Sequence, residues 1–178
     1  MTPTERAARL RMMVFDVDGV LTDGRLYIGP QGELMKAFDV RDGHGIKLLR
    51  EAGLTVALLT ARRSDIVAQR SAELGIELVR QGQSDKLAGF QQLLADTGMH
   101  AEQCGYMGDD WPDLPVLKRA RLAATVADGC AECKAIAHWT STAPGGRGAA
   151  RELAEFIVRA QGKFDALLTK HTDGTLHA

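Results

Sequence analysis

The sequence has no run of apolar residues long enough to cross a membrane. Its longest apolar stretch is GLTVALLTA at 53–61, whereas a spanning helix needs about 20 such residues. The first thirteen residues contain several arginines but no apolar segment, which is unlike a secretory signal. These absences favour a protein that works in the cytoplasm.

The sequence also has little excess charge and few cysteines. Its 22 basic and 23 acidic residues give a formal net charge of −1, so no basic excess suggests nucleic-acid binding. The three cysteines are Cys104, Cys130 and Cys133. A single Cys-x-x-Cys pair does not supply the four ligands of a structural zinc site, and we expect all three thiols to be reduced.

What the sequence does contain is an alternation of strand and helix patterns typical of one globular domain of 178 residues. Apolar runs predict strands, and amphipathic segments that begin at capping residues and end at glycines predict helices. The strands are expected at 12–17, 54–60, 76–80, 103–108, 121–126 and 138–142. The helices are expected at 42–53, 63–75 with Ser64 as N-cap, 84–98 with Ser84 as N-cap, 109–120, 130–137 and 145–170, followed by a frayed tail at 171–178.

This alternation predicts an α/β fold, with a Rossmann-like parallel sheet covered by helices on both faces. The turn signal GPQG between two short apolar stretches predicts a β-hairpin flap at about 25–38. Because nothing larger separates the first strand from the first helix, we expect no cap domain. Residues 1–178 then form a single domain, with a C-terminal helix and tail at about 148–178.

Polar side chains lie at the carboxyl ends of four predicted strands, either as the last residues of the strand or just after it. They are Asp16 and Asp18 in DVDG, Thr60 in LTAR, Lys86 in GQSDK, and Asp109, Asp110 and Asp113 in GDDWPD. In an open parallel sheet these ends meet at one edge, where ligands bind. Carboxylates gathered there repel one another unless a cation lies among them. Oxygen ligands of this kind suit Mg²⁺.

These residue types match the needs of phosphoryl transfer. Asp16 can act as a nucleophile, and Asp18 can give a proton to the leaving oxygen and later activate water. Thr60 and Lys86 can hold the phosphoryl oxygens, over which the transition-state charge is spread. Each stretch taken alone also fits an ordinary turn or helix cap, so the hypothesis depends on the four occurring together, in this order.

The order D-x-D-G-x-L-T, a strand-end Thr, a helix-start Lys and G-D-x-x-x-D resembles the haloacid dehalogenase-like phosphatases. The stretches DVDGVLTDGRLYIG, FDVRDGHGI, QGQSDKL, GDDWPDLPV and PGGRGAARE resemble a narrower family, the 3-deoxy-D-manno-octulosonate 8-phosphate (KDO 8-phosphate) phosphatases. The similarity runs from Met12 to the last helix. The first motif is common to the superfamily, whereas the hairpin, the QG-x-x-x-K stretch and the GGRGA loop are specific.

The resemblance implies Mg²⁺-dependent hydrolysis of KDO 8-phosphate in lipopolysaccharide precursor synthesis, through an aspartyl-phosphate intermediate on Asp16. It implies that Asp18 is the general acid and base and offers its backbone carbonyl to the metal. Asp109 is then the second carboxylate ligand, and Asp113 helps to order its loop.

The same resemblance implies that Thr60 and Lys86 bind the phosphoryl oxygens. The carboxylate of the sugar acid suits a guanidinium group, for which Arg62 and Arg147 are the candidates. His44 in DGHGI is a weaker candidate for the mouth of the site.

The resemblance further implies a homotetramer assembled through the β-hairpin, in which a neighbouring subunit closes the site. A capless site has a physical reason for this, because electrostatic stabilisation needs water to be excluded. One departure is Ala61, where the family often has glycine. A methyl group is tolerable there unless φ is positive.

Three alternatives stay open at this point. A receiver domain also combines a phosphorylated aspartate with a Thr or Ser and a Lys around Mg²⁺, although its acceptor follows the third strand. The fold could serve as a non-catalytic oligomerisation module. The substrate could be a related nine-carbon keto-sugar acid phosphate.

Overall fold

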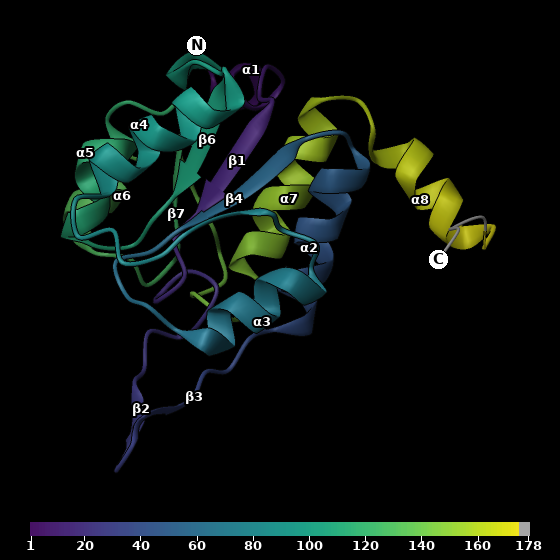
Figure 1. Ribbon diagram of the computed structural model, residues 1–178. Coiled ribbons are helices and arrows are strands. Elements are labelled where there is room, and N and C mark those ends of the chain that lie inside the picture. Colours follow the sequence, from purple (N-terminus) through teal and green to yellow (C-terminus); the bar gives the residue numbers. More distant parts are fainter. Residues whose placement is uncertain (175–178) are drawn as a thin grey trace.

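The computed structural model describes residues 1–174 and is built on a six-stranded parallel sheet with the order β5-β4-β1-β6-β7-β8 (Figure 1). The predicted fold class is therefore confirmed. The strands of this sheet are β1 (Met12–Phe15), β4 (Thr55–Leu59), β5 (Leu78–Arg80), β6 (Cys104–Met107), β7 (Leu122–Thr125) and β8 (Trp139–Thr140).

Helices cover both faces of the sheet, with α2, α3 and α7 on one face and α4, α5 and α6 on the other (Figure 1). Successive residues of β1 pack into the two cores in turn: Met13 and Phe15 join the first, Met12 and Val14 the second. The helices are α1 (Pro3–Ala7), α2 (Val40–Glu51), α3 (Asp65–Glu73), α4 (Lys86–Thr97), α5 (Leu114–Leu117), α6 (Ala131–Ile136), α7 (Ala149–Ala160) and α8 (Phe164–Thr172), with short 3-10 turns at Ala101–Gln103 and Trp111–Asp113.

The hairpin formed by β2 (Tyr27–Gly29) and β3 (Gly32–Met35) is separate from the sheet. It projects away from the body of the molecule on the side where β1 and β4 end (Figure 1). Within residues 16–39 it is the one regular element. The predicted flap is therefore present. Between β1 and α2, where a cap domain would be inserted, the chain has this short hairpin.

The C-terminal region differs from its prediction. The single helix expected at 145–170 is divided into α7 and α8, because the chain turns at Gly162, where φ is +68°. The left-handed conformation there favours glycine and ends a helix. The expected fraying at 171–178 is wrong for the two residues that α8 includes, and residues 175–178 lie outside the described part of the chain.

Other helices also differ from expectation; the one expected at 109–120 is a 3-10 turn at Trp111–Asp113 followed by the short α5. The N-cap of α4 is Asp85 and not Ser84, because the Asp85 carboxylate accepts a hydrogen bond from the backbone N–H of Ala88. The short helix α1 was not predicted, although Thr2 and Glu5 form a capping box at its start. Across residues 1–174, every helix is too short or too polar to cross a membrane.

Candidate active site

The four polar stretches predicted from the sequence meet at the carboxyl edge of the sheet. They line one open cavity of about 270 Å³. Its predicted members are Asp16 and Asp18 after β1, Thr60 and Arg62 after β4, Lys86 at the start of α4, and Asp109, Asp110 and Asp113 after β6. Parallel pairing explains the convergence, because β4 and β6 both flank β1 in register.

Lys86 lies between two buried carboxylates. Its Nζ is 2.6 Å from Oδ2 of Asp16 and 2.5 Å from Oδ1 of Asp113. Burial opposes the charge of Lys86, but the two carboxylates outweigh burial and raise its pKa. The ammonium group is therefore fixed and charged at the floor of the cavity.

Asp113 holds the loop that carries Asp109. Its Oδ2 accepts hydrogen bonds from the backbone N–H groups of Asp109 and Asp110, at 3.0 and 3.2 Å. Its Oδ1 accepts from the Tyr106 hydroxyl at 2.5 Å as well as from Lys86. Tyr106 could not be identified from the sequence, because a tyrosine in an apolar strand gives no sign of where its hydroxyl points.

Negative charge exceeds positive charge at this end of the sheet. Asp16, Asp109 and Asp113 each offer a carboxylate oxygen within 4.8 Å of the others. Among the described residues, Lys86 is the one ammonium group paired with these carboxylates, so the group carries a net charge of −2 when all three are ionised. Burial raises the pKa of Asp16 to about 7, against the lowering effect of Lys86. Burial and the neighbouring carboxylates raise the pKa of Asp109 to about 8.

This imbalance fits a hard divalent cation such as Mg²⁺, which prefers oxygen ligands and brings the missing charge. The local backbone lets the ligands approach closely. Gly19 has a φ of +86°, and a Cβ added there would lie 2.1 Å from Oδ2 of Asp109. The glycine of the DVDG stretch is therefore needed both for the turn and for the packing of the Asp109 carboxylate.

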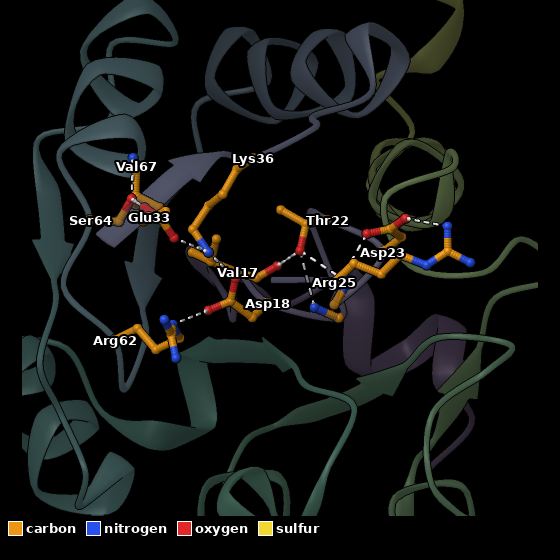
Figure 2. Close-up of polar contacts among 12 residues, drawn as sticks. Val17, Asp18, Thr22, Asp23, Arg25, Glu33, Lys36, Arg62, Ser64 and Val67 are labelled. Atoms are coloured by element: carbon orange, nitrogen blue, oxygen red, sulfur yellow. Dashed lines mark hydrogen bonds and ion pairs between the residues drawn. The ribbon is translucent and has the colours of Figure 1, made fainter. Parts of the chain in front are cut away.

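The Asp18 side chain pairs with one residue that follows the hairpin and one in the loop after β4 (Figure 2). Its Oδ1 pairs with the ammonium group of Lys36, and its Oδ2 lies 3.8 Å from Nε of Arg62. Lys36 also pairs with Glu33 at 3.0 Å, and Glu33 accepts a hydrogen bond from the Ser64 hydroxyl. These contacts could not be predicted from the sequence, because they depend on how the hairpin folds back.

Comparison with known proteins places these residues in a family. Residues 57–153 match the family model described as haloacid dehalogenase-like hydrolase. The KDO 8-phosphate phosphatase KdsC of Yersinia pestis is 44% identical over 161 residues, which cover 90% of this chain and 86% of that protein. The chain belongs to the haloacid dehalogenase-like hydrolases.

Two solved haloacid dehalogenase-like structures have nearly the same fold. A probable YrbI-family phosphatase of Pseudomonas syringae is 43% identical, with a TM-score of 0.92 and coverage of 99% of this chain and 98% of that one. The KDO 8-phosphate phosphatase of Moraxella catarrhalis, solved with magnesium, phosphate and KDO, is 37% identical, with a TM-score of 0.92 and coverage of 95% and 97%.

Two residues that the sequence suggested for the site, Arg147 and His44, lie outside the cavity. Arg147 is exposed and lines a neighbouring hollow with Asp23 and Phe38, because its loop is hydrogen-bonded to the loop after β1, from Gly146 N–H to the carbonyl of Val20. The side chain of His44 is not at the mouth of the site.

His44 instead contacts His171 in a hollow between α2, α7 and α8, with ring centroids 5.1 Å apart. Ala61 lines the cavity. Positive φ angles in residues 1–174 occur only at glycines, so the methyl group of Ala61 causes no backbone strain. Cys104, Cys130 and Cys133 are free thiols, as expected.

Proposed function

We propose that this protein is a Mg²⁺-dependent phosphatase that hydrolyses KDO 8-phosphate to KDO and phosphate. The observation that carries the proposal is the pairing of Asp16 with Lys86 beside an uncompensated acidic group in an open cavity. The named relatives act on KDO 8-phosphate, and the Moraxella enzyme was solved with magnesium, phosphate and KDO. These relatives favour a phosphatase over a receiver domain or a non-catalytic module.

In the first half of the proposed reaction, a carboxylate oxygen of Asp16 attacks phosphorus and the bond from phosphorus to the sugar oxygen breaks. Lys86 offers a fixed positive charge to the phosphoryl oxygens, and the Thr60 hydroxyl, which lines the same cavity, offers a hydrogen bond. Asp18 gives its proton to the departing sugar oxygen. The result is free KDO and an aspartyl phosphate on Asp16.

In the second half, Asp18 takes a proton from a water molecule as that water attacks phosphorus. The bond between phosphorus and Asp16 breaks, so the carboxylate is regenerated and inorganic phosphate leaves. Asp16, Asp109 and the backbone carbonyl of Asp18 would hold Mg²⁺, which when bound offsets the charge of the phosphoryl group. Asp113 orders the Asp109 loop through the hydrogen bonds described above.

Substrate recognition is assigned to two arginines. Arg62 lines the cavity and its side chain is 46% exposed. Its Nε lies 3.8 Å from Asp18, and the other N–H groups of its guanidinium would bind the carboxylate of the sugar acid. Arg147 faces outward from its own hollow, from which it could serve the site of a neighbouring subunit. The nine-carbon alternative differs from KDO 8-phosphate only beyond the shared carboxylate and phosphate groups, so these contacts do not separate the two substrates.

The exposed side chains of the hairpin support the proposed assembly. Ile28 and Leu34 are 68% and 69% exposed, and Leu26 and Met35 are exposed beside them. Side chains of this kind on a projecting element suit a contact with other copies of the chain. We assign the protein a homotetrameric assembly through this hairpin, a single domain over residues 1–178 and a cytoplasmic location, where phosphorylated sugars that do not cross membranes are made.

The test of substrate is phosphate release, with Mg²⁺ present, from KDO 8-phosphate, its nine-carbon analogues and simple hexose phosphates. We expect the highest kcat/KM on KDO 8-phosphate. A preference for a nine-carbon acid would keep the mechanism and change the substrate. A preference for hexose phosphates would contradict the assignment.

The test of mechanism is the variant Asp16→Asn, compared with Asp165→Asn, which changes an exposed residue of α8. Loss of the nucleophile should reduce kcat by at least ~10³-fold, because the uncatalysed reaction is among the slowest known. The control should keep the wild-type rate. Turnover by Asp16→Asn near the wild-type rate would overturn the role of Asp16.

A further inference from the structure

Lys36 occupies an unusual position for a hairpin lysine. Its side chain is 2% exposed, whereas the apolar side chains beside it, Leu34 and Met35, are 69% and 46% exposed. Lysine is almost never this buried unless it is paired. The segment therefore buries a cationic side chain and exposes apolar ones to solvent. The stability of the hairpin does not require this arrangement.

The partners of Lys36 connect the hairpin to the active site. One partner is Glu33 of β3, three residues before Lys36, which is itself held by the hydroxyl of Ser64 at the start of α3. The other partner is Asp18, which belongs to the loop after β1 (Figure 2). A chain of polar contacts thus runs from α3 through the hairpin to the side chain assigned as the general acid and base.

The two oxygens of the Asp18 carboxylate have different surroundings. Oδ1 is taken by Lys36, and Oδ2 lies on the side of Arg62, 3.8 Å from its Nε. Asp18 and Arg62 line the same cavity as Asp16. With Oδ1 occupied by an ammonium group, which can only donate hydrogen bonds, the transferable proton belongs on Oδ2.

We infer that Lys36 is a positioning residue for the reaction, which fixes the orientation of Asp18 so that Oδ2 serves the leaving oxygen. Glu33 and Ser64 hold Lys36 in place for this task. The inference rests on the proposed function, because it assumes that Asp18 transfers a proton to a departing alcohol. It gives the hairpin a role within the site of its own subunit, in addition to any role in assembly.

Loss of proton donation has a chemical signature. An alcohol as basic as a sugar hydroxyl must be protonated as it leaves, whereas p-nitrophenolate leaves without a proton. A defect in the positioning of Asp18 should therefore slow cleavage of the sugar phosphate far more than cleavage of p-nitrophenyl phosphate. A general loss of structure would slow both esters alike.

The experiment measures single-turnover release of the alcohol, with enzyme in excess, for KDO 8-phosphate and p-nitrophenyl phosphate. The variants are Lys36→Met, Lys36→Arg and Glu33→Gln, with Asp18→Asn as the reference and Lys47→Met, which changes an exposed lysine of α2, as the matched control. The unfolding temperatures of the variants are also compared with that of the wild type. They should be similar, because the hairpin lies outside both cores.

For Lys36→Met we expect at least a ~10-fold loss of rate on the sugar phosphate, a loss below ~3-fold on p-nitrophenyl phosphate and an unchanged KM. Asp18→Asn should show the same selectivity with a larger loss. Lys36→Arg should recover most of the rate, Glu33→Gln should show a smaller loss, and Lys47→Met should match the wild type.

Three results for Lys36→Met would each overturn the inference. They are equal losses of rate on the two esters, a rise in KM without a change in the single-turnover rate, and a wild-type rate on the sugar phosphate. The wild-type enzyme separates this outcome from failure of the proposed function. If it cleaves a different sugar phosphate, the proposed substrate is wrong, and Lys36 is then tested on that ester by the same comparison.

Discussion

The parallel sheet and the hairpin distribute their side chains in opposite ways. In the sheet, apolar residues such as Met13 and Phe15 are fully buried between helices. In the hairpin, Ile28 and Leu34 are about two-thirds exposed, while the side chain of Lys36, the residue after β3, is 2% exposed. Folding of the single chain accounts for the first distribution, because burial of apolar surface drives it.

Folding of the single chain does not account for the second distribution. Exposed apolar groups on a projecting hairpin gain nothing until another surface covers them, and a buried ammonium group needs carboxylates around it. The two regions also differ in charge. Lys36 and Arg62 balance Asp18 and Glu33 beside the hairpin, whereas the three carboxylates and Lys86 at the sheet end carry a net charge of −2 when all are ionised. The excess of carboxylates at the sheet end therefore favours a bound metal ion. The exposed apolar side chains of the hairpin favour a contact with another copy of the chain.

The largest effect is expected from removing the one cation of the sheet end. The variant Lys86→Met leaves Asp16 and Asp113 without their partner, and breaking such a buried pair costs about 3–5 kcal/mol. Urea unfolding in the presence of EDTA measures the loss, with Lys47→Met as the control. A loss below ~1 kcal/mol would show that Lys86 does not offset the acidic group.

The second prediction concerns pH. In the metal-free protein the pKa values of Asp16 and Asp109 are raised to about 7 and about 8, so between pH 5.5 and 8 the folded state binds more protons than the unfolded state. Stability should therefore fall as pH rises through this window. Unfolding midpoints should show this fall in EDTA, a smaller fall with Mg²⁺, and a smaller fall for Asp109→Asn. A stability that rises with pH in EDTA would contradict the site's electrostatics.

The hairpin should respond in a different way. The double variant Ile28→Ser and Leu34→Ser should reduce the proposed tetramer to smaller species, because it removes exposed apolar surface. The unfolding free energy of the body should change by less than ~0.5 kcal/mol per site. Sedimentation velocity measures the assembly, and Val40→Ser, an exposed apolar residue of α2, is the control. A tetramer that survives the double change would remove the hairpin from the interface.

The smallest effect is expected at Ala61, which lines the cavity without backbone strain. The variant Ala61→Gly should keep kcat within ~2-fold and lose no more than about 1 kcal/mol of stability, through greater freedom of the unfolded chain. Steady-state kinetics and thermal unfolding measure both. A large gain in activity would mean that the methyl group obstructs the substrate.

The sheet end could be predicted from the sequence because few rules determine it. Apolar runs give the strands, parallel pairing brings their carboxyl ends to one edge, and the polar residues that follow them must then meet. Asp16, Lys86 and Asp109 converge in this way. The carboxylates of Asp113 and Asp18 were also identified, although their individual contacts were not.

The remaining features depend on tertiary packing that no local pattern records. The burial of Lys36 follows from the angle at which the hairpin folds back, and the Tyr106 hydroxyl reaches Asp113 only in the assembled sheet. The division between α7 and α8 had a local signal in Gly162, but the apolar pattern continues across it and favours one helix. No local pattern shows that Arg147, whose loop packs on the loop after β1, lines a hollow beside the cavity and not the cavity itself.

The most direct test of the account is the position of the phosphoryl group during turnover. The enzyme is mixed with Mg²⁺ and KDO 8-phosphate, quenched in acid within one turnover, digested and analysed by mass spectrometry. The account predicts one phosphoryl group, on the peptide that contains Asp16, and none on that peptide in Asp16→Asn. Phosphorylation of another residue, or turnover at the wild-type rate by Asp16→Asn, would contradict it.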